Sequence, residues 1–384
     1  MFDRLIDFIQ EHYQTSGFIP LHAPVFRGNE RSYVLETIDS TFVSSVGAFV
    51  DRFESDVARY TGSERAVATM NGTAALHIAL ILAGVESNDL VITQPLTFVA
   101  TCNAIAYCGA EPVFVDVERR TMGLSPTALE AWLEDHAAVD MDGVCRHKKS
   151  GRAIRACVPM HTFGHPADLD GLIRVCAKWA IALVEDAAES LGSLYKGQHT
   201  GTLGAVGTLS FNGNKILTTG GGGMVLCDSA SGVRAKHITT TAKKPHAYEY
   251  MHDELGYNYR LPNLNAALGC AQLEQLEAFV REKRALAAKY SEILRDGDLR
   301  FFEEPADCRS NYWLNVVICP DRTVRDAMLT ETNAQGVTTR PIWQLMTRLP
   351  MYEQALSGPL VNAEWLEDRV VNVPSGILPI ATST

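Results

Sequence analysis

Short apolar runs alternate with helix-like stretches between residues 64 and 230 of this 384-residue chain. Helical patterns separate these runs, and one of the helices opens at Pro126 directly after Ser125. The alternation predicts right-handed βαβ units and an α/β fold whose mostly parallel sheet is covered on both faces. The runs with the length of buried strands are 66–69, 90–93, 113–115, 156–160 and 181–184, and the clearest helical patterns are 73–83, 98–107 and 168–179.

The N-terminal segment has an amphipathic pattern of its own. Within residues 1–13, charged side chains avoid one helical face, and the apolar residues that share this face are Phe2, Leu5, Ile6 and Ile9. A signal peptide would need an uninterrupted apolar stretch and a small-residue cleavage site. We therefore expect a helix that packs on the body of the protein or on a partner subunit.

The C-terminal third predicts a second, smaller unit. A long helical stretch at 263–295 is followed by a strand at 313–318 and a helix at 324–333. This mixture is typical of an α+β domain. The expected organisation is an N-terminal amphipathic helix in 1–18, a large α/β domain in 19–262, and a connecting helix with a small domain in 263–384.

Composition and charge exclude several classes of protein. Hydrophobic residues make up 46% of the chain, yet no apolar run approaches the roughly 20 residues that span a bilayer. We expect a cytoplasmic protein with no membrane partner. The net charge of −11 argues against nucleic acid as a partner. None of the nine cysteines is in a Cys-x-x-Cys pair, and no His, Cys or Asp trio has metal-ligand spacing, so we expect neither a disulfide framework nor a metal site.

One segment departs from the acidic balance. The stretch 142–155 carries five basic residues within ten positions: Arg146, Lys148, Lys149, Arg152 and Arg155. Two interpretations are open for this segment. It is either a solvated hairpin or a patch that attracts an anionic, phosphorylated substrate.

Polar residues stand where predicted strands end, at Asn71, Thr97, His161 and Asp186. In parallel sheets ligands bind beyond the carboxyl ends of the strands, so we expect one site built from four segments. Asn71 also begins a strand-to-helix turn (NGTAAL, 71–76) with a small, unobstructed helix N-terminus. Its backbone N–H groups and the Thr73 hydroxyl suit a phosphate, although an ordinary helix cap is the other interpretation.

Lys215 and Asp186 carry the most specific chemistry. Asp186 ends a buried apolar run, and Lys215 lies 29 positions later, just before the glycine run at 220–223. A lysine can form a Schiff base, and a buried acid can hold a ring nitrogen protonated, so the pair predicts a pyridoxal-phosphate enzyme. The glycine run is not a P-loop, because the lysine precedes it. A serine hydrolase is disfavoured, because no Gly-x-Ser-x-Gly elbow is present.

Six ordered blocks resemble a known family. They are Gly47 with Phe53-Glu54, then 71–76, 96–101 (LTFVAT), 185–190 (EDAAES), 210–215 (SFNGNK) and 256–261 (GYNYRL). From about residue 19 to residue 340 the chain resembles the DegT/DnrJ nucleotide-sugar aminotransferases, which have the type I (aspartate-aminotransferase-like) pyridoxal-phosphate fold. The resemblance implies pyridoxal 5′-phosphate as cofactor, with pyridoxamine phosphate formed during the cycle.

The resemblance also implies residue roles. Lys215 would hold the cofactor covalently and, once released, move protons, while Asp186 would pair with the pyridine nitrogen. Phe98 would stack on the ring, and Glu189 would lie near the ring hydroxyl. A homodimer with shared active sites is implied, because one phosphate contact would come from the neighbouring subunit. The residues expected at the phosphate are Gly72, Thr73, Ala74, Ser210 and, from the neighbouring subunit, Asn258.

The implied reaction moves an amino group from L-glutamate to a nucleotide-linked 4-keto-6-deoxysugar. A finer resemblance is to the aminotransferases of legionaminic acid biosynthesis, carried by blocks at 19–22 (IPLH), 40–47 (STFVSSVG), 159–166 (PMHTFGHP) and 339–343 (TRPIW). It implies a UDP-linked 2-acetamido-2,6-dideoxy-4-ketohexose. The residues expected near the sugar are His161, Arg340 and Trp343, with the 142–155 insertion nearby.

Several alternatives stay open at this point. The sugar could be GDP- or dTDP-linked, or the enzyme could be a 3-aminotransferase. A pyridoxamine-dependent dehydratase would have histidine in place of Lys215 and is disfavoured. A non-enzymatic regulatory protein is disfavoured, because Lys215 and Asp186 are both retained. His161 is either a site residue or a structural one, whereas His165 is expected to be a satisfied structural histidine.

Overall fold

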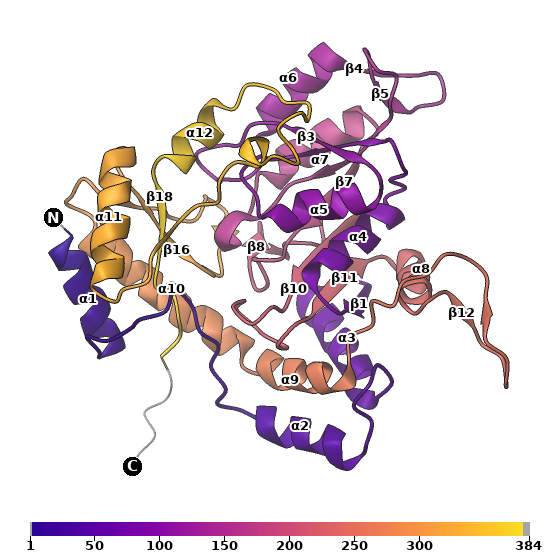
Figure 1. Cartoon of the computed structure of the whole chain (residues 1–384), viewed down its shortest axis with the longest axis horizontal. Coiled ribbons are helices and arrows are strands. Elements are labelled where there is room, and N and C mark those ends of the chain that lie inside the picture. Colours follow the sequence, from indigo (N-terminus) through magenta and orange to yellow (C-terminus); the bar gives the residue numbers. More distant parts are fainter. Residues whose placement is uncertain (1, 379–384) are drawn as a thin grey trace.

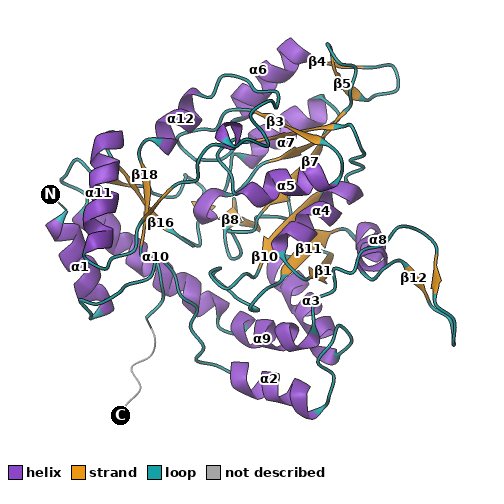
Figure 2. Ribbon diagram, in the orientation of Figure 1, coloured by secondary structure: helices purple, strands orange, loops and turns teal. Residues whose placement is uncertain are grey.

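The computed structural model describes residues 2–378 and is organised around a seven-stranded sheet (Figure 1, Figure 2). The strand order is β1-β11-β10-β7-β6-β2-β3. Only the two pairs that involve β11 are antiparallel, so the predicted α/β fold with a mostly parallel sheet is confirmed. The strands are β1 (Arg65–Thr69), β2 (Leu90–Thr93), β3 (Glu111–Phe114), β6 (Ile154–Val158), β7 (Ala182–Asp186), β10 (Val206–Ser210) and β11 (Gly223–Cys227).

Helices cover both faces of this sheet, as Figure 2 shows. Strand residues alternate between the two layers: Val91 and Val184 pack with α4, α5 and α8, whereas Ile92 and Leu183 pack with α6 and α7. Near β11, Leu226 packs on the layer of α3 and α9. The helices are α3 (Ala48–Thr61), α4 (Gly72–Leu82), α5 (Val99–Tyr107), α6 (Pro126–His136), α7 (Leu169–Lys178), α8 (Ser229–Thr239) and α9 (Asn263–Leu273).

Side-chain caps explain where several of these helices begin. Asn71 accepts a hydrogen bond from the Ala74 amide at 2.8 Å, and Ser125 accepts one from the Ala128 amide at 3.2 Å, directly before Pro126. Such caps satisfy amides that have no partner inside the helix. The Asn71 cap fixes the chain direction directly after β1, and therefore the position of the first turn of α4 at the carboxyl edge of the sheet.

A second, antiparallel sheet forms the left-hand part of Figure 1. Its strand order is β14-β16-β18-β17. The N-terminal helix packs here, since Ile6 and Ile9 share a core with Tyr290 and Val317. The elements are β14 (Arg300–Phe301), β16 (Asn315–Ile318), β17 (Arg340–Pro341), β18 (Val370–Val373), α1 (Asp3–Tyr13), α10 (Leu276–Ile293), α11 (Arg322–Ala334) and α12 (Val361–Glu367).

The expected domain boundaries, between residues 18 and 19 and between 262 and 263, stay a prediction. Met1 and residues 379–384, which the expected first and last units include, lie outside the described residues. Among residues 2–378, no helix combines the length and the apolar character that crossing a bilayer requires.

The single long helix expected at 263–295 is wrong. Two helices, α9 and α10, occupy this stretch and are separated at Glu274 and Gln275. The side-chain amides of Gln272 and Gln275 both donate to the buried Glu30 carboxylate, at 2.6 and 2.7 Å. The break contains no proline or glycine. The contacts with the distant Glu30 hold the bend instead.

Two hairpins extend from the body. The hairpin of β12 (Lys243–Lys244) and β13 (Met251–His252) projects at the right of Figure 1, and that of β4 (Ala137–Val139) and β5 (Cys145–His147) lies at the top. Below the sheet, α2 (Glu30–Asp39) lies beside α9. The remaining elements are β8 (Leu194–Tyr195), β9 (Gln198–His199), β15 (Cys308–Arg309) and the short 3-10 helices η1 (Thr162–Gly164) and η2 (Met346–Arg348).

Candidate active site

A cavity of about 310 Å³ opens at the carboxyl edge of the central sheet. It brings together the ends of β7 and β10, the first turn of α4, the segment 212–215, and two tryptophans from the C-terminal part of the chain. Ligands bind at this edge in parallel α/β sheets. The lining residues that the sequence predicted for a cofactor or substrate are Gly72, Thr73, Phe98, Asp186, Glu189, Ser210, Lys215 and Trp343.

Asp186 lies at the end of β7, almost fully buried, and its carboxylate faces the cavity. Thr101 on α5 donates its hydroxyl to Oδ2 at 2.7 Å, and the Ala188 amide donates to Oδ1 at 3.2 Å. Burial raises the pKa of Asp186, and these two hydrogen bonds act against the rise. The result is a fixed, low-dielectric carboxylate that suits a cationic ring nitrogen.

Lys215 reaches the cavity from the turn after β10. Its Nζ lies 3.1 Å from Oε1 of Glu189 and 4.0 Å from the centre of the Trp313 ring. Burial raises the pKa of Glu189 to about 7, although contact with Lys215 and a hydrogen bond from the Phe163 amide at 2.9 Å oppose this. A primary amine therefore lies beside a carboxyl group that can release and accept a proton near neutral pH.

The N-terminus of α4 forms another wall of the cavity. Gly72 and Thr73 open the helix, where amides have no acceptor within the helix itself. A Cβ atom on Gly72 would lie 2.9 Å from Cβ of Ser210, so only glycine lets the helix and β10 approach this closely. Ala74 differs from expectation, because its amide donates to Asn71 and its side chain does not line the cavity.

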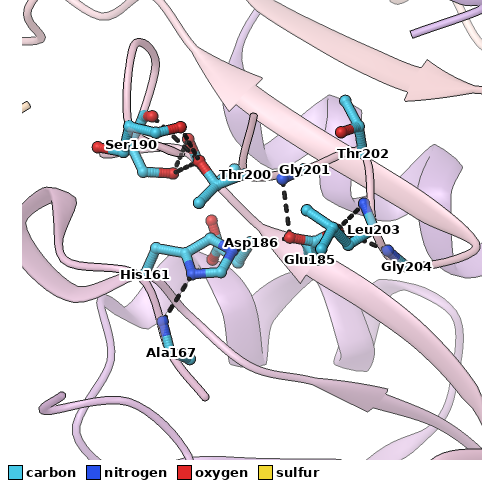
Figure 3. Close-up of polar contacts among 12 residues, drawn as sticks. His161, Ala167, Glu185, Asp186, Ser190, Thr200, Gly201, Thr202, Leu203 and Gly204 are labelled. Atoms are coloured by element: carbon cyan, nitrogen blue, oxygen red, sulfur yellow. Dashed lines mark hydrogen bonds and ion pairs between the residues drawn. The ribbon is translucent and has the colours of Figure 1, made fainter. Parts of the chain in front are cut away.

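Of the two interpretations left open for His161, the structural one matches its surroundings, because His161 does not line the cavity. Its ring is fully buried, and the Ala167 amide donates to Nδ1 at 3.1 Å, so Nε2 carries the hydrogen and donates to Glu185 at 3.0 Å (Figure 3). Both ring nitrogens are thus occupied by partners that do not line the cavity. A position at a strand end does not show whether the side chain points into the protein core, as here, or toward the cavity.

Glu185, the partner of His161, holds a backbone turn in place (Figure 3). The amides of Gly201, Leu203 and Gly204 donate to its two oxygens at 2.6–2.8 Å. Although burial acts to raise it, the hydrogen bonds from His161 and the backbone amides keep the pKa of Glu185 below its ordinary value. The negative charge of Glu185, the residue before Asp186, is therefore compensated by donors that do not line the cavity.

Three other predicted residues lie in different places. Trp343 lines the cavity and packs on Phe163, with ring centres 4.8 Å apart. Arg340 is exposed, donates to Asn333 at 3.2 Å, and does not line the cavity. Asn258 is exposed too and accepts hydrogen bonds from Arg260, so its role toward a neighbouring subunit stays a prediction.

His165 is buried as expected but not satisfied. Neither ring nitrogen has a hydrogen-bond partner among the described residues, and the ring packs edge-on against Phe302 and Tyr312. Burial lowers the pKa of His165 to about 3, with a further contribution from Arg284. It is a neutral core side chain with no link to the cavity.

The basic segment 142–155 is a hairpin in which the three arginines pair with carboxylates of the same chain. Arg146 bonds Asp140 at 2.6 Å, Arg152 bonds Glu111 at 2.7 Å, and Lys148 donates to the Glu134 carbonyl at 2.6 Å. The hairpin leads into the amino end of β6, whereas the cavity lies at the carboxyl ends. This geometry matches the solvated hairpin and not a substrate-attracting patch.

One group of metal-type side chains does converge among the described residues, outside the cavity: His237, Asp253 and Glu254. Lys244 pairs with Asp253 at 3.2 Å, and Arg234 pairs with Glu254 at 3.1 Å. These ion pairs already compensate both carboxylates, so the group is an exposed charge cluster at the base of the β12–β13 hairpin.

Sequence reasoning missed several lining residues. Trp313 is the most informative, because its ring faces Lys215 and its Nε1 donates to the Asn214 carbonyl at 2.7 Å. Its position at the start of the strand predicted at 313–318 held no signal for a site about a hundred residues earlier in the chain. Asn71, expected at the site from its strand-end position, also lines the cavity. The other unpredicted lining residues are Leu76, Ala100, Met160, Ala188, Asn212, Asn214 and Gly222.

The residues present fit pyridoxal 5′-phosphate. An amine, a buried carboxylate on a strand end and a glycine-opened helix N-terminus surround one cavity. Phe98 is 50% exposed and lines the cavity beside Trp343, with the two ring centres 6.5 Å apart. Lys215 and Asp186 would hold the two ends of a pyridine ring, and the first turn of α4 with Ser210 would hold a phosphate.

Comparison with known proteins gives the same result. The model of the DegT/DnrJ/EryC1/StrS aminotransferase family matches residues 25–378. The chain is 37% identical to EpsN of Bacillus subtilis, named as a pyridoxal phosphate-dependent aminotransferase, over 88% of this chain and 84% of that protein. It is 34% identical to the GDP-perosamine synthase of Escherichia coli O157:H7, over 93% of each chain.

A solved structure agrees in shape as well as in sequence. The aminotransferase TlmJ from Streptoalloteichus hindustanus superposes with a TM-score of 0.84 and 30% identity, covering 94% of each chain. This agreement in shape confirms the expected type I fold. The chain belongs to the DegT/DnrJ/EryC1/StrS aminotransferase family and is a pyridoxal-phosphate-dependent enzyme.

Proposed function

We propose that the enzyme transfers the amino group of L-glutamate to the C4 keto group of a nucleotide-linked 4-keto-6-deoxysugar. The observation that carries the proposal is the convergence of Lys215, Asp186 and the α4 N-terminus on one cavity. Family membership supports an aminotransferase, and relatives named GDP-perosamine synthase support a nucleotide sugar as acceptor.

Asp186 has the role of a fixed counter-charge. When bound, pyridoxal phosphate supplies an electron sink for the carbon whose proton is removed. The Asp186 carboxylate favours a protonated ring nitrogen, because burial makes a charge pair stronger there than in water. Thr101 and the Ala188 amide keep the carboxylate aimed into the cavity.

Lys215 would hold the cofactor and, once released, move protons. Its Nζ lies in the cavity, where a free amine could take a proton from one carbon and deliver it to another. Glu189 lies within hydrogen-bond distance of Nζ and supports either charge state of the lysine. Phe98 would cover one ring face, and Trp343 would border the sugar.

We further propose that the active enzyme is a homodimer with shared sites. Apolar side chains on α2 and the segment after it are exposed in the single chain. Exposed apolar patches of this kind are typical of subunit interfaces. Asn258, on an exposed stretch beside β1, would then reach the phosphate of the neighbouring subunit. The exposed members are Leu35, Ile38, Phe42, Val43 and Val46.

Two nucleotides compete for the substrate. The motifs similar to legionaminic acid enzymes support a UDP-linked 2-acetamido-2,6-dideoxy-4-ketohexose. The identities of 34% to three GDP-perosamine synthases support a GDP-linked sugar instead. Because the 142–155 hairpin lies away from the cavity, discrimination falls to residues nearer Trp343 and to the neighbouring subunit.

The deciding experiment is a screen of UDP-, GDP- and dTDP-linked 4-keto-6-deoxysugars with L-glutamate, read out as 2-oxoglutarate release and as the mass of the amino sugar. We expect turnover with one nucleotide class at a kcat/KM at least about tenfold above the others, which corresponds to roughly 1.4 kcal/mol of discrimination. The Lys215→Ala enzyme is the matched blank. Absence of turnover with all three classes, in protein that binds cofactor, would refute the sugar assignment.

A further inference from the structure

Trp313 contacts the catalytic lysine and its neighbour at the same time. The centre of its ring lies 4.0 Å from Nζ of Lys215, and its Nε1 donates to the Asn214 carbonyl at 2.7 Å. A cation over a tryptophan face is attracted by the negative potential of the ring. One indole therefore binds the side chain of Lys215 and the backbone just before it.

The backbone of Trp313 is held firmly behind the cavity. Its amide donates to the Asn311 side chain at 2.8 Å, and its carbonyl accepts from Nζ of Lys283 at 3.0 Å. Lys283 is 1% exposed and also donates to the Ser375 carbonyl at 2.5 Å. A buried amine that donates to two carbonyls orders these acceptors around it. The indole is thus fixed before any ligand binds.

Glu189 is held by the same group of residues. The Asn311 side-chain amide donates to the Glu189 carbonyl at 2.9 Å, so one asparagine positions both the indole and the glutamate. The Glu189 carboxylate and the Trp313 ring contact the same Lys215 Nζ. Carboxylate and aromatic face both favour an ammonium over a neutral or covalently linked nitrogen.

We propose that Trp313 and Glu189 form a resting site for the Lys215 ammonium during the part of the cycle in which Lys215 is not linked to the cofactor. Trp313 is a positioning residue, because it acts through Lys215. The site stabilises every form in which the lysine is free, namely the apoenzyme and the form that holds the amino group on the cofactor, relative to the covalently linked form. This inference rests on the proposed covalent role of Lys215.

The test compares binding of the two cofactor forms to apoenzyme. Dissociation constants for pyridoxal phosphate and pyridoxamine phosphate are measured by absorbance titration in wild type and in Trp313→Leu. Loss of the resting site destabilises the apoenzyme and the pyridoxamine phosphate complex alike but not the covalently linked complex, so the ratio of the pyridoxal phosphate constant to the pyridoxamine phosphate constant should fall by about 2- to 30-fold. Trp313→Phe keeps a weaker aromatic face and should give a smaller shift in the same direction.

Three controls keep the outcome interpretable. Trp365→Phe, an indole outside the cavity, should leave the ratio unchanged. In a Lys215→Ala background the effect of Trp313→Leu should vanish, because no ammonium is left to bind. Glu189→Gln removes the carboxylate that forms the other part of the resting site, so it should lower the ratio too. This variant provides a test even if Trp313→Leu fails to fold.

An unchanged ratio in Trp313→Phe and Glu189→Gln would overturn the proposal, as would a Trp313→Leu effect that persists without Lys215. The proposed role of Lys215 is tested separately, by borohydride reduction of the wild-type holoenzyme and mass mapping of the labelled lysine. A label elsewhere would remove the proposed function. A label on Lys215 with an unchanged ratio would remove only the resting site.

Discussion

Three carboxyl groups within five residues have different environments although all are buried. Glu185 receives four hydrogen-bond donors and keeps a lowered pKa, while Glu189 has a pKa raised to about 7. Asp186, between them in sequence, faces the cavity with two donors. Alternation along β7 and the turn after it directs neighbouring acids to opposite sides, so each can have its own protonation state.

At Lys215, replacement by alanine should abolish turnover without unfolding the protein. We expect loss of at least about 100-fold in rate, because both the covalent attachment and the proton carrier disappear. The visible absorbance of the linked cofactor should be absent, while the melting temperature changes by only a few degrees. Lys178→Ala, which removes a lysine paired with Glu130 and Glu134 at the surface, is the matched control. Wild-type turnover in Lys215→Ala would contradict the mechanism.

Glu189 makes the stability of the apoenzyme depend on pH. Its folded-state pKa is raised to about 7 from 4.5, so the folded state binds a proton that the unfolded state has released. Stability from this group is therefore present below about pH 4.5 and is lost as pH rises through 7, by roughly 3 kcal/mol. In urea titrations, the free energy of unfolding of Glu189→Gln, relative to that of wild type, should increase as the pH rises from 5 to 8. A constant difference across this range would contradict the assignment.

Residue chemistry was predictable from sequence where it depended on residue type at a strand end. Lys215 and Asp186 were found because an amine and an acid in that order suggest one cofactor. His161 had the same strand-end position but points away, since Glu185 and the Ala167 amide occupy its ring. Trp313 could not be found, because its contact with Lys215 spans 98 positions.

At the scale of elements, the turn between β1 and α4 depends on a neighbouring glycine. A Cβ on Gly223 of β11 would lie 2.4 Å from the Asn71 carbonyl oxygen, closer than side chains are found. Gly223→Ala should displace this turn, destabilise the protein by about 1–3 kcal/mol, and weaken cofactor binding. Thermal melts and cofactor titration measure both effects. Gly297→Ala, whose Cβ would meet nothing closer than 3.9 Å, should change neither.

Element type was predictable over most of the central sheet, because buried runs and caps are local signals. The break between α9 and α10 was not, since Gln272 and Gln275 bend the chain through contacts with Glu30, more than 240 positions away. Intrinsic helix preference favours one continuous helix there. Contacts distant in sequence override such preference, and a single sequence does not show them.

At the scale of the whole molecule, the apolar surface on α2 should decide the assembly state. Leu35 and Ile38 are 56% and 52% exposed in the single chain. The double variant Leu35→Glu/Ile38→Glu should sediment as a monomer and lose most activity, because Asn258 would no longer reach a neighbouring site. Val361→Glu, an equally exposed position on α12, should remain dimeric. A dimeric, active double variant would contradict the proposed interface.

The exposed hairpin of β4 and β5 has a practical consequence. Met141 at its tip is fully exposed, and the hairpin enters the sheet at the edge opposite the cavity. A fluorophore or affinity handle attached at this tip would leave the catalytic residues untouched. The segment that first suggested substrate attraction therefore offers a place from which to immobilise or observe the working enzyme.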